Sequence, residues 1–240
     1  QPNGLNINLE AGSTHPQALR KAVVEHQADL GIAFDGDGDR VMMVDAEGNL
    51  LDGDQLLYII AQHRHQQGQL VGGIAGTLMT NLALEHAFKK ANIPFARAKV
   101  GDRYVREMLV ENGWQLGGEN SGHILCLDKH TSGDGIIAAL QVLAALNAQN
   151  KSLTEVGKGL TLYPQVLINV PIKHRIDMQA NPAIQAAVES AEQTLNGHGR
   201  ILLRASGTEL KFRVMVEGQD GQLVKKLATQ IADIVAEQAK

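Results

Sequence analysis

The chain is poor in cysteine and lacks a strong excess of charge of either sign. It has a single cysteine, Cys126, among 240 residues, so no disulfide can form within it. That composition fits a reducing cytoplasm. The net charge of −4 lacks the basic excess that is typical of nucleic-acid binding. We therefore expect a cytoplasmic protein with no nucleic-acid partner.

Long apolar runs are also missing. No stretch approaches the roughly 20 apolar residues that a membrane span needs, and the polar start QPNGLNIN has no signal-peptide core. We expect no membrane partner. The chain begins with Gln1 rather than methionine, and its first periodic segment starts almost at once, which predicts a piece of a longer protein. Its 44% hydrophobic and 20% charged residues are typical of a soluble globular protein.

What is present is an alternation of short apolar runs with longer amphipathic segments, which is typical of an α/β protein with largely parallel strands. After Tyr163-Pro164 the pattern changes to three strands and two helices within roughly 75 residues, as in a small α+β domain. We predict three domains, at residues 1–52, 53–162 and 163–240. The expected strands are 30–34, 41–44, 72–75, 95–98, 115–116, 124–127, 166–170, 200–204 and 212–217. The expected helices are 16–27 with Ser13 or Thr14 as cap, 54–67, 78–92, 102–112, 135–149, a short one from 153, 182–195 and 223–238.

The stretch FDGDGDR, residues 34–40, lies on the connection between two of these strands. Asp35, Asp37 and Asp39 alternate with glycines that allow a tight turn, so three carboxylates can converge on one point. Like charges this close raise one another's pKa unless a cation lies among them. Hard oxygen ligands in this number suit Mg²⁺ or Ca²⁺.

Three other kinds of loop share parts of this pattern. A calcium EF-hand is excluded, because its sixth and twelfth positions hold Arg40 and Ala46 and strands flank the loop. A haloacid-dehalogenase-type phosphatase would make Asp35 a nucleophile and Asp37 its acid, but that motif usually has Thr or Val where this chain has Asp39. A solvated acidic turn is the third, and it leaves the carboxylates' repulsion uncompensated.

Two further loops carry groups suited to a phosphorylated sugar. The loop GGENSGH, residues 117–123, offers a carboxylate, a hydroxyl and an imidazole that could grip vicinal hydroxyls and move a proton. The segment RASGTE, residues 204–209, together with Arg213, offers backbone N–H groups, hydroxyls and two guanidiniums as an anion nest. Each loop alone also fits an ordinary turn, so the combination carries the prediction.

Read together and in this order, DGDGDR, GENSGH and RASGTE resemble the α-D-phosphohexomutase superfamily. The surrounding text, including PNGLNIN, GDQLLYIIA and TSGDGI, is most similar to the bacterial phosphoglucosamine mutase family within it. The resemblance covers essentially the whole chain. It implies a fold of phosphohexomutase-type α/β domains, one partial (1–52) and one complete (53–162), followed by a small α+β phosphate-binding domain (163–240).

The resemblance also implies the chemistry of the first loop. Asp35, Asp37 and Asp39 match the family's Mg²⁺-binding residues, and Arg40 matches an arginine that contacts the active-site phosphoserine. His123 matches a position proposed for general acid/base work. The implied cofactor is Mg²⁺.

The other implied roles concern the substrate. Glu119 and Ser121 match residues that hold sugar hydroxyls. The residues that match the loop for the non-transferred phosphate are Arg204, Ser206, Gly207, Thr208 and Arg213. The residues that match a segment lining the cleft are Lys99, Asp102 and Arg103.

The implied reaction isomerises glucosamine 6-phosphate to glucosamine 1-phosphate, for cell-wall precursor synthesis. A phosphoserine donates its phosphoryl group, and a bisphosphorylated sugar forms and turns around. The family's serine loop, of T-A-S-H-N type, does not occur here, so we expect an N-terminal phosphoserine domain as the missing partner and no activity from these 240 residues alone. Leu210 stands where the family usually has proline. The sequence is compatible with a homodimer.

Two alternative functions stay open. Phosphomannomutases and phosphoglucomutases share all three loops, so the choice of sugar rests on resemblance alone. A non-catalytic fragment that binds Mg²⁺ and a sugar phosphate would need the same residues.

Overall fold

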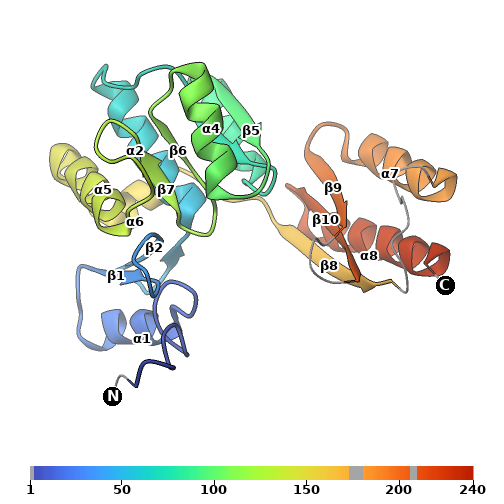
Figure 1. Ribbon diagram of the computed structural model, residues 1–240, viewed down its shortest axis with the longest axis horizontal. Helices are drawn as coiled ribbons and strands as arrows, with labels where there is room; N and C mark the ends of the chain where they lie inside the picture. Colours follow the sequence, from blue (N-terminus) through green and yellow to red (C-terminus); the bar gives the residue numbers. More distant parts are fainter. Residues whose placement is uncertain (1–2, 173–180, 206–209, 240) are drawn as a thin grey trace. The chain divides into compact units, whose positions relative to one another are not determined.

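The computed structural model describes residues 3–172, 181–205 and 210–239. The chain forms two compact units, Gln1–Thr161 and Leu162–Lys240, each described here by itself (Figure 1). The family-type mixed α/β fold expected from the sequence is confirmed. The further division of the first unit at residue 52 stays a prediction. No helix among the residues described is both long and apolar enough to cross a membrane.

The first unit begins with helix α1 (Gln17–Glu25) and an antiparallel three-stranded sheet. Strands β1 (Leu30–Phe34), β2 (Val41–Asp45) and β3 (Leu50–Leu51) follow in that order across the sheet. The pairing of Phe34 with Val41 closes the first hairpin, so residues 35–40 form its tip. These strands are antiparallel rather than largely parallel, because each connection is too short for a crossover.

The second sheet of this unit has the strand order β5-β4-β6-β7. Its strands are β4 (Ile74–Thr77), β5 (Phe95–Ala98), β6 (Leu116–Gly118) and β7 (Ile124–Cys126), and β4 is parallel to both β5 and β6. The chain leaves β4 toward β5 and leaves β6 toward β7. The carboxyl ends of β4 and β6 therefore flank a topological switch point, where open α/β sheets bind ligands.

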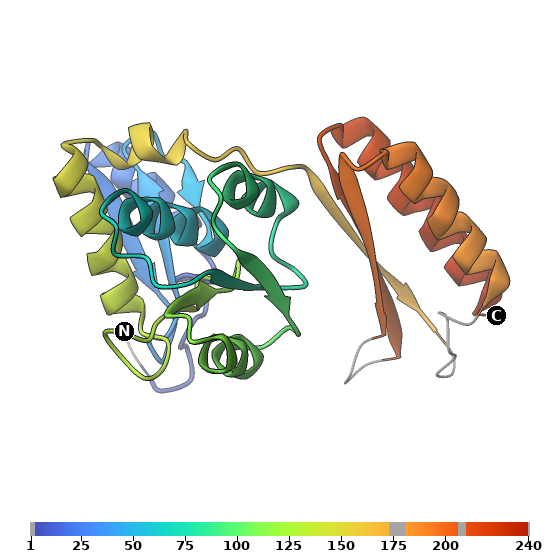
Figure 2. The ribbon, with the colours of Figure 1, turned by 90° about the horizontal axis from the view of Figure 1, so that it is seen from above.

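The helices that follow the first sheet in this unit are α2 (Gly53–Gln66), α3 (Leu82–Lys90), α4 (Asp102–Asn112), α5 (Gly135–Gln149) and α6 (Leu153–Gly157). Figure 2 shows the second sheet between α4 on one side and α2 and α3 on the other. Asp52 and Gln55 form a capping box that starts α2. A buried cluster of Ala75, Ala98, Val105, Leu109 and Leu125 fixes α4 to the strands.

Several expected boundaries differ from the structure. The helix expected from 78 begins at Leu82, because the side chain of Asn81 caps it by accepting from the Ala83 N–H at 3.0 Å. Neither Ser13 nor Thr14 caps α1, whose N-cap is Pro16. The short strand β3 was missed, since its two residues carry no readable period. The expected helices 102–112, 135–149 and 182–195 are confirmed.

The second unit is an antiparallel sheet covered by two helices. The strand order is β8-β10-β9, with β8 (Gln165–Pro171), β9 (Gly199–Ala205) and β10 (Lys211–Gly218). Helices α7 (Pro182–Leu195) and α8 (Gly221–Gln238) lie side by side on one face (Figure 2). Ile184, Val214, Val224, Ile231 and Val235 are among the fully buried side chains between the helices and the sheet. The opposite face carries charged side chains such as Arg213 together with the apolar Met215, Leu167 and Leu202.

Candidate functional site

The three aspartates of the β1–β2 hairpin tip converge in the structure. Asp35, Asp37 and Asp39 each offer a carboxylate oxygen, and these oxygens lie within 4.8 Å of one another. Gly38 makes this geometry accessible, because its φ of +76° is a conformation that side chains disfavour. The predicted convergence of carboxylates is therefore present.

Arg40 supplies positive charge to this cluster from within the loop. Its backbone N–H donates to Oδ1 of Asp35 at 3.0 Å. Its guanidinium Nε lies 3.8 Å from Oδ2 of Asp35 and 4.0 Å from Oδ1 of Asp39. The guanidinium is partly exposed, so one face can still meet an anion from outside. A single arginine leaves the three carboxylates with a net negative charge.

His123 joins the sugar-type loop to the acidic loop. The imidazole is buried, and its Nδ1 lies 2.9 Å from Oδ2 of Asp39. The backbones of Arg40 and His123 form an antiparallel bridge, and the N–H of Val41 donates to the carbonyl of Gly122 at 3.1 Å. Two segments that are distant in the sequence thus form one site.

Asp39 lies beside both other carboxylates of the loop and beside an imidazole. Burial raises the pKa of its carboxyl, the charge of His123 lowers it, and the nearby Asp35 and Asp37 raise it further, with a net upward shift. Its buried Oδ1 accepts no hydrogen bond within the described part of the chain. A cluster of hard oxygen atoms, one of them unsatisfied, fits Mg²⁺.

Glu119 and Ser121 lie on the turn between β6 and β7, at the switch point of the second sheet. The Glu119 carboxylate is held by the backbone N–H of Gly101, which donates to Oε1 at 2.9 Å. The buried hydroxyl oxygen of Ser121 has no hydrogen-bond partner among residues 3–172, 181–205 and 210–239. The turn closes through Gly122, whose N–H donates to the Glu119 carbonyl at 3.0 Å. One fixed acceptor and one free hydroxyl are suitable for sugar hydroxyls.

The start of α2 supports this turn from below. The N–H of Gly53 donates to the carbonyl of Asn120 at 3.1 Å. A Cβ at Gly53 would collide with the Glu119 carbonyl, so only glycine allows this approach. Burial raises the pKa of the capping carboxyl of Asp52, with backbone N–H donors acting in the opposite sense.

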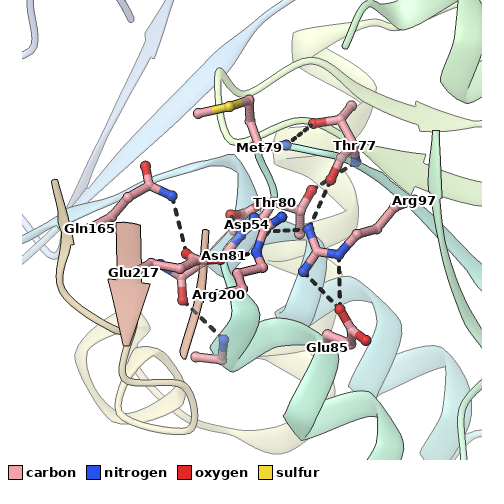
Figure 3. A network of polar contacts seen from close by, with 11 residues as sticks. Asp54, Thr77, Met79, Thr80, Asn81, Glu85, Arg97, Gln165, Arg200 and Glu217 are labelled. Carbon is pink, nitrogen blue, oxygen red and sulfur yellow. Dashed lines mark hydrogen bonds and ion pairs between the residues drawn. The ribbon is translucent and has the colours of Figure 1, made fainter. Parts of the chain in front are cut away.

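The loop after β4 is fixed by Arg97, as Figure 3 shows. Its guanidinium donates to the carbonyls of Thr77 at 3.0 Å and Thr80 at 2.6 Å and pairs with Glu85 at 2.8 Å. It also lies 5.4 Å above the Phe95 ring. The carboxyl end of β4, next to the Glu119 turn, is therefore rigidly built.

Three glycine positions were missed by sequence reasoning. Gly101 holds Glu119 and has a φ of +128°. Gly133 packs so closely on the His123 ring that a Cβ there would overlap it. The N–H of Gly135 donates to the Gly38 carbonyl at 2.9 Å. The signal available was a glycine directly before a helix in VGDR and two glycines in TSGDGI, but their partners are remote in the sequence.

The segment that matches the family's cleft lining contains Lys99, Asp102 and Arg103, and these three side chains have different surroundings. The Nζ of Lys99 lies 5.7 Å from the centroid of the Tyr104 ring. Arg103 is 80% exposed and pairs with Glu107 of its own helix at 2.7 Å. Asp102 is the first residue of α4, where its carboxylate favours the positive end of the helix dipole.

The second unit carries Arg204 and Arg213, the two arginines expected to bind phosphate. Arg204 and Arg213 are directly opposed on β9 and β10, so both side chains leave the same face of the sheet. The buried Nε of Arg213 has no hydrogen-bond partner among the described residues. Ser206, Gly207 and Thr208 lie outside the described residues. Leu210 is exposed.

A separate buried pair stabilises the same sheet. Glu217 is fully buried and accepts from Gln165 at 3.1 Å and from Arg200, as drawn in Figure 3. Such a pair needs both partners, since either charge alone would be costly. Arg200 therefore has a structural role in this sheet.

Comparison with protein families assigns each part of the chain. Residues 3–48 match the phosphoglucomutase/phosphomannomutase alpha/beta/alpha domain II, residues 52–163 match its domain III, and residues 167–234 match its C-terminal domain. The chain belongs to the phosphoglucomutase/phosphomannomutase family.

Similar proteins within this family include phosphoglucosamine mutases. The chain is 72% identical over 239 residues to the phosphoglucosamine mutase of Methylobacillus flagellatus, with 100% of this chain and 53% of that protein covered. It is 61% identical to the phosphoglucosamine mutase of Nitrosospira multiformis over 98% of this chain and 50% of that protein. The chain therefore spans about half the length of these relatives.

A solved structure supports the fold. Aspergillus fumigatus N-acetylphosphoglucosamine mutase, in complex with GlcNAc-6P and magnesium, matches with a TM-score of 0.80 over 97% of this chain and 54% of that chain. At 22% identity this likeness concerns the fold alone.

Proposed function

We propose that this chain supplies the metal, sugar and phosphate sites of a phosphoglucosamine mutase. The enzyme would isomerise glucosamine 6-phosphate to glucosamine 1-phosphate through a phosphoserine and a bisphosphorylated sugar. The observation that carries the proposal is the junction of the acidic loop and the GGENSGH loop at Asp39 and His123, in a chain 72% identical to a phosphoglucosamine mutase. The phosphoserine belongs to a part of the enzyme outside these 240 residues.

The acidic loop provides the charge balance for phosphoryl transfer. Asp35, Asp37 and Asp39 would hold Mg²⁺, which neutralises charge on the transferring group when bound. The exposed part of the Arg40 guanidinium is available to the phosphate of the phosphoserine. The backbone N–H of Arg40 is bonded to Asp35, so the backbone from which the guanidinium extends is placed before transfer.

The sugar is oriented by the β6–β7 turn. Glu119 accepts from sugar hydroxyls while Gly101 fixes its other oxygen, and the Ser121 hydroxyl, which has no partner among the described residues, provides a further contact. Both residues lie on a turn that is tied to the acidic loop by the Gly122 carbonyl. The reacting end of the sugar is thereby held beside the aspartates.

The second unit holds the phosphate that is not transferred. Arg204 and Arg213 share one face of the sheet, so their guanidiniums can approach one phosphate from the same side. With Ser206, Gly207 and Thr208 they would form the anion nest. The cytoplasmic location and the homodimer stay predictions from the sequence.

Calorimetric titration of the 240-residue chain tests this assignment. We expect it to bind Mg²⁺ and to bind glucosamine 6-phosphate more tightly than glucose 6-phosphate or mannose 6-phosphate. Preference for one of the latter would reassign the chain to a phosphoglucomutase or phosphomannomutase. Failure to bind any sugar phosphate would overturn the proposal.

A turnover assay is the second test of the proposed function. With glucosamine 6-phosphate and a bisphosphate activator, the chain alone should give no product, whereas the whole enzyme should turn over. Efficient turnover by the chain alone would contradict a phosphoserine located outside it. Sugar-phosphate binding without turnover in the whole enzyme would leave a non-catalytic binding protein.

A further inference from the structure

We propose that Gly135, the first residue of α5, is a positioning residue for the acidic loop, and that it acts by holding the carbonyl of Gly38. This inference rests on the proposed function only through its Mg²⁺ site. The N–H of Gly135 donates to that carbonyl at 2.9 Å. Gly38 lies between Asp37 and Asp39, so the bond holds the backbone from which two of the three carboxylates extend.

The close approach of α5 to the loop is possible because residue 135 is a glycine. A Cβ at this position would lie 2.8 Å from the Arg40 carbonyl oxygen and 2.9 Å from the Gly38 carbonyl oxygen. Both are backbone atoms of the loop, which cannot turn aside as the end of a flexible side chain can. A larger residue must therefore displace the loop or the start of the helix.

Helix α5 is a firm support for this contact. The Asp134 carboxylate caps the helix by accepting from the Ile137 N–H at 2.9 Å. Ala138 and Val142 are fully buried on its inner side, and the helix contacts β2, β7 and α2. A helix packed against three other elements moves little, so the Gly38 carbonyl is held against a fixed point.

The tip of the loop needs such a hold because its own charges act against it. Three carboxylates whose oxygens lie within 4.8 Å of one another repel, and without a cation this repulsion favours an opened tip. Gly38 has a φ of +76°, but a glycine adopts negative φ values as readily, so its own preference does not keep the turn. A bond from outside the hairpin keeps the carboxylates converged, and Mg²⁺ then meets ligands that are already in place.

Calorimetric Mg²⁺ titration of the chain with two matched glycine variants tests the proposal. In Gly135→Ala the added methyl group displaces the loop, and we expect Mg²⁺ to bind about 10-fold more weakly. Gly73→Ala is the control, because a Cβ there is crowded by residues outside the loop, at 2.6 Å from the Pro94 carbonyl oxygen and 2.8 Å from the Trp114 ring. Gly73→Ala should lower the thermal unfolding midpoint and leave the Mg²⁺ affinity unchanged. Circular dichroism establishes that each variant is folded.

Amide hydrogen exchange of the unaltered chain, measured by NMR with and without Mg²⁺, provides a test that needs no variant. If the Gly135 hydrogen bond favours Mg²⁺ binding, then Mg²⁺ favours the hydrogen bond by the same factor. Saturating Mg²⁺ should therefore slow exchange of the Gly135 N–H about 10-fold. The control is the N–H of Leu223, which donates to the capping carboxylate of Asp220 at 3.1 Å in the second unit and should be unaffected.

The outcomes separate the positioning role from the metal site itself. If folded Gly135→Ala binds Mg²⁺ as tightly as the unaltered chain, or if Mg²⁺ leaves exchange of the Gly135 N–H unchanged, the proposal is overturned while the metal site stands. Equal weakening in Gly135→Ala and Gly73→Ala would also overturn it, since general destabilisation would then be sufficient. If Gly135→Ala does not fold, the exchange measurement decides. If the unaltered chain binds no Mg²⁺, both the positioning role and the metal part of the proposed function are wrong.

Discussion

The two units build their candidate sites in different ways. In the first, segments remote in the sequence are tied by backbone hydrogen bonds, such as Val41 to Gly122 and Gly135 to Gly38. In the second, Arg204 and Arg213 are neighbours across one pair of strands. The first site depends on tertiary packing, whereas the described part of the second depends on local register. Substitutions should therefore have cooperative effects in the first unit and separable effects in the second.

The largest effect is expected at Gly122, where the two loops of the first unit meet. Its φ is +92°, and a Cβ would collide with the backbone carbonyl of Val41. Backbone strain and overpacking together should lower the free energy of unfolding by about 3 kcal/mol in Gly122→Ala. Chemical denaturation of the chain measures this.

Gly113→Ala is the matched control. Gly113 also has a positive φ, +66°, but a Cβ there meets nothing within 4 Å. Gly113→Ala should lower the free energy of unfolding by about 1 kcal/mol, from backbone strain alone. Equal losses in the two variants would show that the junction of the loops contributes nothing.

Next in size is the loss of one proposed metal ligand. Asp37 is the most exposed of the three aspartates, so Asp37→Asn should fold normally. Removing one charged oxygen should weaken Mg²⁺ binding about 100-fold, or about 2.7 kcal/mol. Calorimetry provides the affinity, with the exposed Asp29→Asn as control. Unchanged Mg²⁺ affinity in Asp37→Asn would restore the solvated-turn interpretation.

The second unit is tested by Arg213→Gln. Loss of one guanidinium should weaken binding of glucosamine 6-phosphate about tenfold, or about 1.4 kcal/mol, and leave Mg²⁺ affinity unchanged. Lys226→Gln, on the exposed side of α8, should change neither. A joint loss of metal and sugar-phosphate binding in Arg213→Gln would refute the separability inferred for this unit.

The features that could be predicted from the sequence are those that depend on local geometry, and the features that could not are those that depend on tertiary packing. The aspartate cluster was predictable because its geometry is local, with alternate positions and glycines between them. The helix 135–149 was predictable because Asp134 precedes a long apolar segment and caps it. The contact of Asp39 with His123 was not, since no local pattern brings these residues together. The support from Gly133 is likewise a tertiary effect.

The predicted start of a helix at residue 78 was wrong because a local pattern was present but tertiary contacts outweighed it. Its residues favour a helix, but Thr77 ends β4 and Arg97 holds the following loop through two carbonyls. Asn81 then starts α3 by capping it. Tertiary hydrogen bonds therefore override propensity at the edge of the sheet where ligands are expected to bind.

The smallest effect is expected at Arg103, which decides how far the first unit's site extends. Its guanidinium is mostly exposed and pairs only with Glu107 among the described residues, an arrangement that water and salt screen strongly. Arg103→Ala should therefore leave the thermal unfolding midpoint unchanged. Because it lies in a segment matched to the family's cleft, its effect on glucosamine 6-phosphate affinity is informative. If affinity also stays unchanged, the site is confined to the hydrogen-bonded loops; if affinity falls in a chain of unaltered stability, the site reaches the first turn of α4.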